Sequence, residues 1–229
     1  KSESHEHWMN VRREFMRLLA SGLYTVIAPT QSVANRYRKL ECSLSEIPIH
    51  VVAHGLDVKL SQSFMPVSVL SESTIGDRGR LKIVMLGRLT DEKGANLLRD
   101  MMINLGQFAD LYLLGTGESG GQYYSQPAIK VWESYDRNDL AALLADINPD
   151  LGMLLSTVAE TFSYTLSELW AAGIPVLATR LGAFADRINE SHNGWLVEPA
   201  SAHILEKLRE LDLNRNLLYE AKRYLAHQP

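Results

Sequence analysis

The stretch LKIVMLGRLTDEKGANLL, residues 81–98, joins a short apolar run to a polar loop and then to an amphipathic segment. A continuous apolar run, in contrast to an alternating one, is typical of a strand that is buried on both faces of a sheet. An amphipathic segment directly after such a strand is typical of a helix that covers one of those faces. The stretch therefore predicts the first strand, loop and helix of a parallel sheet.

The same alternation continues along the rest of the chain. Further apolar runs occupy residues 111–114, 128–132, 151–155, 174–178 and 195–197. Amphipathic segments such as residues 95–108 and 137–147 separate most of these runs. We therefore predict an α/β fold for residues 80–229, a Rossmann-like parallel sheet with helices on both faces.

The first part of the chain has a different organisation. Its patterns predict a helix at residues 7–21, a strand at 24–28, a helix at 31–40 and a strand at 49–53. So few elements cannot bury a sheet of their own, so residues 1–57 are predicted to be the end of a preceding α/β domain. Residues 58–79 are rich in serine and lack periodicity, which predicts a linker. Because the chain begins with Lys1, we expect a piece of a longer protein.

Composition excludes several classes of protein. The 229 residues carry a formal net charge of -4, and their lysines and arginines are scattered, which argues against a nucleic-acid partner. The single cysteine, Cys42, excludes an internal disulfide and fits a reducing compartment. No apolar run approaches the roughly 20 residues of a membrane span, and the polar, acidic start is unlike a signal peptide.

The glycine-rich loop GTGESGG, residues 115–121, matches two motifs at once. One is G-x-G-x-x-G of dinucleotide-binding proteins, with Glu133 as the ribose acid, and the other is G-x-S-x-G of serine hydrolases, with Ser119 as nucleophile. Both motifs need a helix directly after the glycines. Only QYYSQ separates the loop from Pro127, about one and a half turns of helix, which is too short to cross a sheet. Both interpretations are therefore disfavoured.

The loop after the first predicted strand carries candidate phosphate ligands. Gly87 at the end of the strand allows a ligand to approach the backbone. Arg88 offers a planar fork for two phosphate oxygens, and Lys93 adds a point charge. The alternative, a solvated loop with ordinary surface cations, stays open at this point.

Two glutamates flank a second candidate anion site, in ETFSYTLSELWAAGIPVLAT, residues 160–179. The apolar spacing predicts a helix that begins near residues 163–165 and ends near Gly173. Glu160 would precede the helix and Glu168 would lie inside it, on the order of 12 Å away in a helical stretch. A carboxylate on each side of a helix N-terminus matches a sugar nucleotide, which has hydroxyls at both ends and a diphosphate between them. The alternative is one acid near a helix start and a second acid on the exposed face of that helix.

These motifs, in this order and with AAGIPVLAT behind them, resemble the donor-binding domain of retaining glycosyltransferases of the GT-B fold, called group 1 or family 4. The resemblance covers about residues 20–200, and the first part of the chain resembles the end of the family's N-terminal domain. It implies transfer of a sugar from a nucleotide-diphosphate sugar to an acceptor hydroxyl with retention of configuration, in polysaccharide or glycan biosynthesis.

The resemblance also assigns roles to individual residues. Arg88 and Lys93 would neutralise the leaving diphosphate, and Glu160 would bind hydroxyls of the transferred sugar. The donor-binding residues would be Gly87, which gives room, Tyr135 at the base pocket, Ser163 and Tyr164 through their backbone N–H groups, Thr165 at the diphosphate and Glu168 at the ribose.

The chain departs from the family pattern at several positions. Ser163 stands where the family usually has glycine, and Glu133 replaces a frequent glycine beside the base pocket. His54 stands where an asparagine is usual, and the paired glycines after the strand PVLAT are reduced to Gly182. These differences leave the shape of the donor loop and the identity of the base open.

The expected partners are a nucleotide-sugar donor and a glycan or lipid-linked acceptor that binds through the missing N-terminal domain. We expect no cofactor and no metal ion, since the sequence has no D-x-D pair to hold a divalent ion against a diphosphate. The expected location is the cytoplasm, either free or at the inner membrane surface, and the chain alone is expected to be inactive. The alternatives are a GT-B sugar-nucleotide epimerase, a non-catalytic sugar-nucleotide-binding module and, last, a hydrolase through Ser119.

Overall fold

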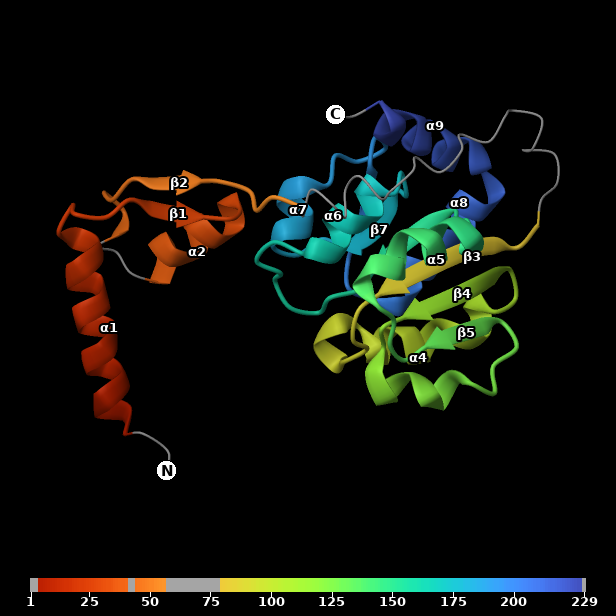
Figure 1. Cartoon of the computed structure of the whole chain (residues 1–229), viewed down its shortest axis with the longest axis horizontal. Helices are drawn as coiled ribbons and strands as arrows, with labels where there is room; N and C mark the ends of the chain where they lie inside the picture. Colours follow the sequence, from red (N-terminus) through yellow and green to blue (C-terminus); the bar gives the residue numbers. More distant parts are fainter. Residues whose placement is uncertain (1–3, 41–43, 57–78, 228–229) are drawn as a thin grey trace. The chain divides into compact units, whose positions relative to one another are not determined.

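The computed structural model describes residues 4–40, 44–56 and 79–227 (Figure 1). The chain divides into two compact units, Lys1–Gly55 and Leu56–Pro229. Of the predicted linker at residues 58–79, all but Gly79 lies outside the described residues. The division into residues 1–57, 58–79 and 80–229 drawn from the sequence therefore stays a prediction.

The first unit contains a pair of parallel strands and two helices. Its elements are α1 (His5–Ala20), β1 (Val26–Ala28), α2 (Gln31–Leu40) and β2 (Ile49–Val51). Val26 of β1 lies opposite Ile49 of β2, and α2 connects the two strands and buries Ala34. All four elements were predicted from the sequence, with small differences at their ends.

The second unit is built on a six-stranded sheet in which neighbouring strands are parallel. Its strands are β3 (Leu81–Leu86), β4 (Ala109–Leu114), β5 (Ile129–Trp132), β6 (Leu151–Leu154), β7 (Val176–Thr179) and β8 (Gly194–Val197). Its α-helices are α4 (Ala95–Leu105), α5 (Leu140–Ile147), α6 (Tyr164–Ala171), α7 (Ala183–Arg187), α8 (Ser201–Leu213) and α9 (Arg215–Ala226). Short 3-10 helices occupy η3 (Asp91–Lys93), η4 (Gly117–Tyr123) and η5 (Arg137–Asp139). The predicted α/β fold and its six strands are confirmed.

Both faces of this sheet are covered by helices (Figure 1). In β3, Ile83 and Met85 join a core with side chains of α4, α8 and α9. The residues between them on the pleat, Val84 and Leu86, join a second core with side chains of α5, α6 and α7. Two apolar faces on one strand are the physical reason for its continuous apolar run.

The strand order places the first strand of this unit beside the fourth. The order is β5-β4-β3-β6-β7-β8, so β3 and β6 are neighbours at the centre. After β3 the chain turns to α4 on one face, and after β6 it turns to α6 on the other face. Such a divergence opens a crevice at the carboxyl ends of the two strands, which is where open α/β sheets bind ligands.

Helix α6 begins and ends as its sequence predicts. Ser163 is the N-cap, and its Oγ accepts a hydrogen bond from the N–H of Leu166. At the other end Gly173, with φ 72, follows the C-cap, and the N–H of Ile174 donates to the carbonyl of Leu169. Ile174 therefore closes the helix, and β7 starts two residues later than the apolar run suggests.

The glycine-rich loop after β4 contains no α-helix. The chain forms the 3-10 helix η4 at Gly117–Tyr123 and then enters β5. The helix N-terminus required by the dinucleotide and hydrolase motifs is therefore not formed between these two strands, as the spacing predicted.

Candidate functional site

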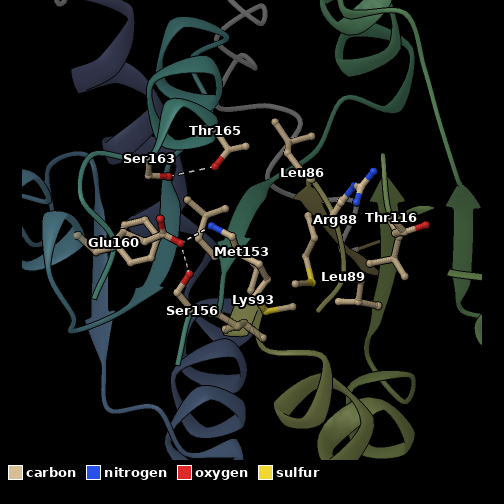
Figure 2. A pocket seen from close by; sticks show the side chains of 16 residues that line it. Leu86, Arg88, Leu89, Lys93, Thr116, Met153, Ser156, Glu160, Ser163 and Thr165 are labelled. Atoms are coloured by element: carbon tan, nitrogen blue, oxygen red, sulfur yellow. Dashed lines mark hydrogen bonds and ion pairs between the residues drawn. The ribbon is translucent and has the colours of Figure 1, made fainter. Parts of the chain in front are cut away.

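A pocket lies at the crevice between the carboxyl ends of β3 and β6 and the start of α6 (Figure 2). Its polar lining consists of Arg88, Lys93, Thr116, Ser156, Glu160, Ser163 and Thr165. Its volume is about 80 Å³, whereas pockets that enclose a whole small ligand have roughly 300–1,000 Å³. The pocket therefore has room for one part of a larger ligand.

The first wall of the pocket is the loop after β3. Gly87 has φ 99, a conformation that favours glycine, and the exposed Arg88 follows it. In the described part of the chain the Arg88 side chain has no ion-pair or hydrogen-bond partner. Figure 2 shows Arg88 and Thr116 on one side of the pocket and Glu160 on the other. An exposed guanidinium without a partner is available to an anion.

The loop between β3 and α4 brings Lys93 to the opposite wall. Gly94 makes this possible, because a Cβ at this position would lie 2.3 Å from the carbonyl oxygen of Leu155, the residue after β6. Thr157 ties the two loops together, since its N–H donates to the carbonyl of Glu92 over 2.9 Å. Lys93 and Glu160, 67 residues apart, thus become neighbours.

Glu160 is the centre of a small polar cluster. Its Oε1 accepts hydrogen bonds from Nζ of Lys93 and from Oγ of Ser156 (Figure 2). The Glu160 side chain is 15% exposed, compared with 50% for Lys93. Ser156 is itself held in place, because Oγ1 of Thr179 donates to its carbonyl over 2.6 Å. The sequence did not single out Ser156, although a polar residue directly after the strand LGMLL is a signal that could have identified it.

The start of α6 forms the third wall. Ser163 has φ 68 and ψ 93, a backbone conformation that side chains with a Cβ rarely adopt and that costs of order 1–3 kcal/mol. Its Oγ lies 3.0 Å from Oγ1 of Thr165, and Thr165 in turn faces Gly87 across the pocket. The first N–H groups of a helix lack intrahelical acceptors and carry a partial positive charge. This wall therefore favours negative charge.

Glu168 lies one turn further along α6, outside this pocket. Its side chain is only 7% exposed, and its Oε1 accepts a hydrogen bond of 2.7 Å from Nη2 of Arg137. The alternative of a solvated acid on the exposed helix face is therefore wrong for Glu168. Arg137 was not recognised in the sequence, because no local pattern links it to a residue 31 positions away.

Tyr135 connects this buried carboxylate with the loops at the sheet edge. Burial and the negative charge of Glu168 raise the pKa of the Tyr135 hydroxyl, and Arg137 opposes the shift. A Cβ on Gly115 would lie 3.0 Å from the Tyr135 ring and 3.8 Å from the Cα of Gly87. Gly115 therefore lies between Gly87, which lines the pocket, and the Tyr135 ring.

Residues 80–212 match the family of glycosyl transferases group 1. The match spans more than half of the chain. This protein belongs to the group 1 glycosyl transferases. The resemblance inferred from the sequence is thereby confirmed, and the six-stranded unit has the fold of a GT-B C-terminal domain.

Solved structures share the fold of this glycosyl transferase. A glycosyltransferase from Rickettsia africae superposes with a TM-score of 0.71 and 19% identity over 93% of this chain and 61% of its own. HepE from Anabaena, in complex with UDP and glucose, gives a TM-score of 0.71 and 18% identity over 97% of this chain and 62% of its own. The present chain thus spans about three fifths of the length of these two proteins.

A shorter solved structure matches part of this glycosyl transferase. The C-terminal domain of the group 1 protein LpcC from Francisella tularensis has a TM-score of 0.56 and 22% identity. The alignment covers 75% of this chain and 94% of that domain. No curated protein matches the sequence.

All predicted site residues of this glycosyl transferase except Tyr164 fall into two groups. The pocket collects Gly87, Arg88, Lys93, Glu160, Ser163 and Thr165. Tyr135 and Glu168 lie together beside Arg137, and the exposed Tyr164 lines neither place. Within the described residues no group of three or more His, Cys, Asp or Glu side chains could hold a metal ion. None of the helices described is long and apolar enough to cross a membrane.

Proposed function

We propose that this chain is the donor-binding half of a retaining glycosyltransferase that moves a sugar from a nucleotide-diphosphate sugar to an acceptor hydroxyl. The product would be a polysaccharide or another glycan. The observation that carries the proposal is the convergence of Arg88, Lys93 and Glu160 with the start of α6 in a single pocket. The single cysteine supports a cytoplasmic location.

The phosphate chemistry would depend on charge that is already in place. Negative charge develops on the diphosphate as its bond to the sugar breaks, and fixed cations and helix dipoles stabilise such charge. Arg88 would bind the phosphate oxygens with its free guanidinium, and the N-terminus of α6 would face them across the pocket. We propose that this arrangement needs no metal ion or other cofactor.

The sugar would bind at Glu160. A carboxylate accepts hydrogen bonds from paired hydroxyls, and Ser156 fixes the orientation of this one. Without a donor, Lys93 neutralises Glu160. With a donor bound, Lys93 would turn towards the diphosphate, and the sugar hydroxyls would take its place at Glu160. Donor binding and the loss of this ion pair would then be one event.

The nucleoside would extend over Gly115 towards Tyr135 and Glu168. Glu168 would accept hydrogen bonds from the ribose hydroxyls through its second oxygen, while Arg137 keeps hold of the first. The exposed Arg137 compensates the charge of the buried carboxylate, which would otherwise be costly to desolvate.

Transfer itself would need a further part of the protein. In our proposal residues 1–57 belong to an acceptor-binding domain, residues 58–79 form a linker and residues 80–229 bind the donor. An acceptor must be held against the reacting carbon of the sugar, and the chain spans only about three fifths of the two longer solved structures. We therefore expect donor binding without transfer to a glycan or lipid-linked acceptor.

The test is a thermal-shift screen of the chain with UDP-glucose, GDP-glucose and ADP-glucose. A ligand at 100 times its dissociation constant adds about 2.7 kcal/mol to the stability of the folded state. The complex of HepE with UDP and glucose makes UDP-glucose the first choice. Arg88→Ala is the matched control, because it removes a phosphate ligand that has no structural partner. For each donor, the increase in melting temperature on adding the donor is compared between the wild type and Arg88→Ala. If no donor gives a larger increase in the wild type, the proposal is wrong.

A further inference from the structure

Arg187, at the end of α7, contacts the donor loop (residues 160–163) without lining the pocket. Its Nη1 donates hydrogen bonds to the carbonyls of Phe162, over 2.7 Å, and of Ser163, over 3.0 Å. Its Nη2 donates to Oγ of Ser167 on α6 over 2.8 Å. One side chain thus holds the end of the donor loop and the first turn of the helix together.

We propose that Arg187 is a positioning residue that holds Ser163 in its left-handed conformation and thereby aims the backbone N–H groups at the start of α6 towards the donor. This inference rests on the proposed function, in which those N–H groups bind the diphosphate or the sugar.

The geometry of the two peptide groups on either side of Ser163 supports this role. The torsions φ and ψ of Ser163 set the angle between the planes of these two groups. Because one nitrogen of Arg187 binds both of their carbonyls, it fixes both torsions at once. In a trans peptide the N–H points opposite to the C=O. The N–H groups of Ser163 and Tyr164 therefore point away from Arg187.

The surroundings of Arg187 make it a rigid clamp. Its guanidinium lies 4.0 Å from the centre of the Phe162 ring and 5.2 Å from that of Trp170. Burial lowers the pKa of Arg187 to about 10, so the side chain stays charged at neutral pH. A charged donor strengthens both carbonyl hydrogen bonds, and the aromatic rings restrict the side chain.

The other end of the donor loop is fixed from the same connection between β7 and β8. The N–H of Ala183 donates to the carbonyl of Glu160 over 2.8 Å. Gly182 allows this approach, because a Cβ there would lie 2.4 Å from the Glu160 oxygen and 2.7 Å from its nitrogen. The donor loop is therefore held at Glu160 and at Ser163, and Arg187 is the anchor at the strained end.

The strain at Ser163 provides a specific test. Glycine adopts positive φ without steric cost, so a glycine at position 163 should need the clamp less than serine does. Arg187→Met should weaken binding of the nucleoside diphosphate, UDP, GDP or ADP according to the donor screen, by about tenfold. Adding Ser163→Gly should recover most of that loss, with the affinity of Ser163→Gly alone measured as the reference for the double variant.

Arg215→Met is the matched control for this pair of substitutions. Arg215 also donates to carboxylate and carbonyl oxygens, at Asp150, Asp212 and Gly79, but it lies at the opposite edge of the sheet. It should lower stability without weakening the nucleoside diphosphate, and Ser163→Gly should restore none of its stability loss. If Arg187→Met does not fold, Arg187→Lys, which keeps the positive charge, is measured in its place. It should lose less affinity for the nucleoside diphosphate than is expected for Arg187→Met.

Amide hydrogen exchange of residues 160–166 tests the clamp without any ligand. Arg187→Met should accelerate exchange there, and Ser163→Gly in the same chain should slow it again. Unchanged exchange in Arg187→Met, or a loss of affinity that Ser163→Gly leaves untouched, would overturn the inference. If the wild type binds none of the three nucleoside diphosphates while exchange responds as expected, Arg187 holds Ser163 in place but the proposed function is wrong.

Discussion

Charged side chains cluster at both ends of the parallel strands, at the amino ends (the amino edge) and at the carboxyl ends (the carboxyl edge). The two clusters differ in whether protein groups neutralise and hydrogen-bond these charges. At the amino edge, Asp150 accepts from the N–H of Lys82 over 2.9 Å and from Nη1 of Arg215 over 3.2 Å. Lys222 donates to the carbonyl of Pro149 over 2.8 Å and is buried. At the carboxyl edge, Arg88 is exposed without a partner in the described chain, and Lys93 is half exposed.

This difference separates structural charges from charges that await a ligand. The charged side chains at the amino edge form hydrogen bonds that link α9, β3 and the turn before β6, and these bonds stabilise the fold. The carboxyl edge keeps cations at a helix N-terminus, where no protein group neutralises all of them. Substitutions at the two edges should therefore affect different measurements, stability at the amino edge and ligand binding at the carboxyl edge.

The largest effect is expected for Asp150→Ala at the amino edge. The substitution removes the carboxylate that faces Arg215 and the buried Lys222. It also removes the acceptor of the backbone N–H of Lys82. Because Asp150 is 23% exposed, we expect a loss of about 2–3 kcal/mol in the free energy of unfolding, near the lower end for a broken buried pair. Urea denaturation measures it. A weaker affinity for the nucleoside diphosphate in the folded variant would contradict the separation of the two edges.

The next effect is expected for Arg88→Ala at the carboxyl edge. A hydrogen bond from a cation to phosphate contributes roughly 1.5–3 kcal/mol, so the affinity for the nucleoside diphosphate should fall about tenfold or more. Titration calorimetry measures this affinity. The free energy of unfolding should change by less than about 0.5 kcal/mol. An unchanged affinity would make the loop after β3 an ordinary solvated loop.

Substitutions of the two glutamates of the candidate site should affect ligand affinity in different ways. Glu168→Ala should weaken a nucleoside diphosphate and its sugar conjugate by a similar factor, since both contain the ribose. Glu160→Ala should weaken only the conjugate, because its partner hydroxyls belong to the sugar, and it should release Lys93 for the diphosphate. Each lost contact should cost about 1–3 kcal/mol. Equal losses for both ligands in both variants would contradict this division of roles.

The smallest effect concerns Lys222 and pH. Burial lowers its pKa below the ordinary 10.5, partly offset by Asp150. Between the two values the unfolded chain binds more protons than the folded one, so this residue makes stability rise with pH until about 10.5. Lys222→Met should lack this rise when unfolding free energies are compared from neutral pH up to about 10.5. Identical slopes in both proteins would show that Lys222 is not the cause.

Much of the second unit followed from local sequence. Apolar runs predict strands such as β3, because each strand is buried on both faces of the sheet. The helix start at Ser163 and the glycine after α6 were also local signals. The glycine-rich loop could be excluded as a dinucleotide or hydrolase motif from chain length alone, since QYYSQ is too short for the required helix.

The partners of the site residues could not be predicted in this way. Ser156 and Arg137 bind Glu160 and Glu168, yet neither stands in a motif. Arg187 lies 24 residues from the carbonyl of Ser163 that it binds. Such contacts depend on the side on which each connection crosses the sheet, and no local propensity records that choice.

By itself the sequence determined the α/β class, the six strands and the candidate phosphate and hydroxyl ligands, because burial periodicity and turn residues act over a few neighbouring positions. Only the tertiary structure decided that Lys93 neutralises Glu160, that Glu168 is buried beneath Arg137 and that Arg187 clamps Ser163. The first of these pairs forms because β3 lies beside β6 and the loops that follow both strands meet at their carboxyl ends. Proximity across 67 residues is a property of the strand order.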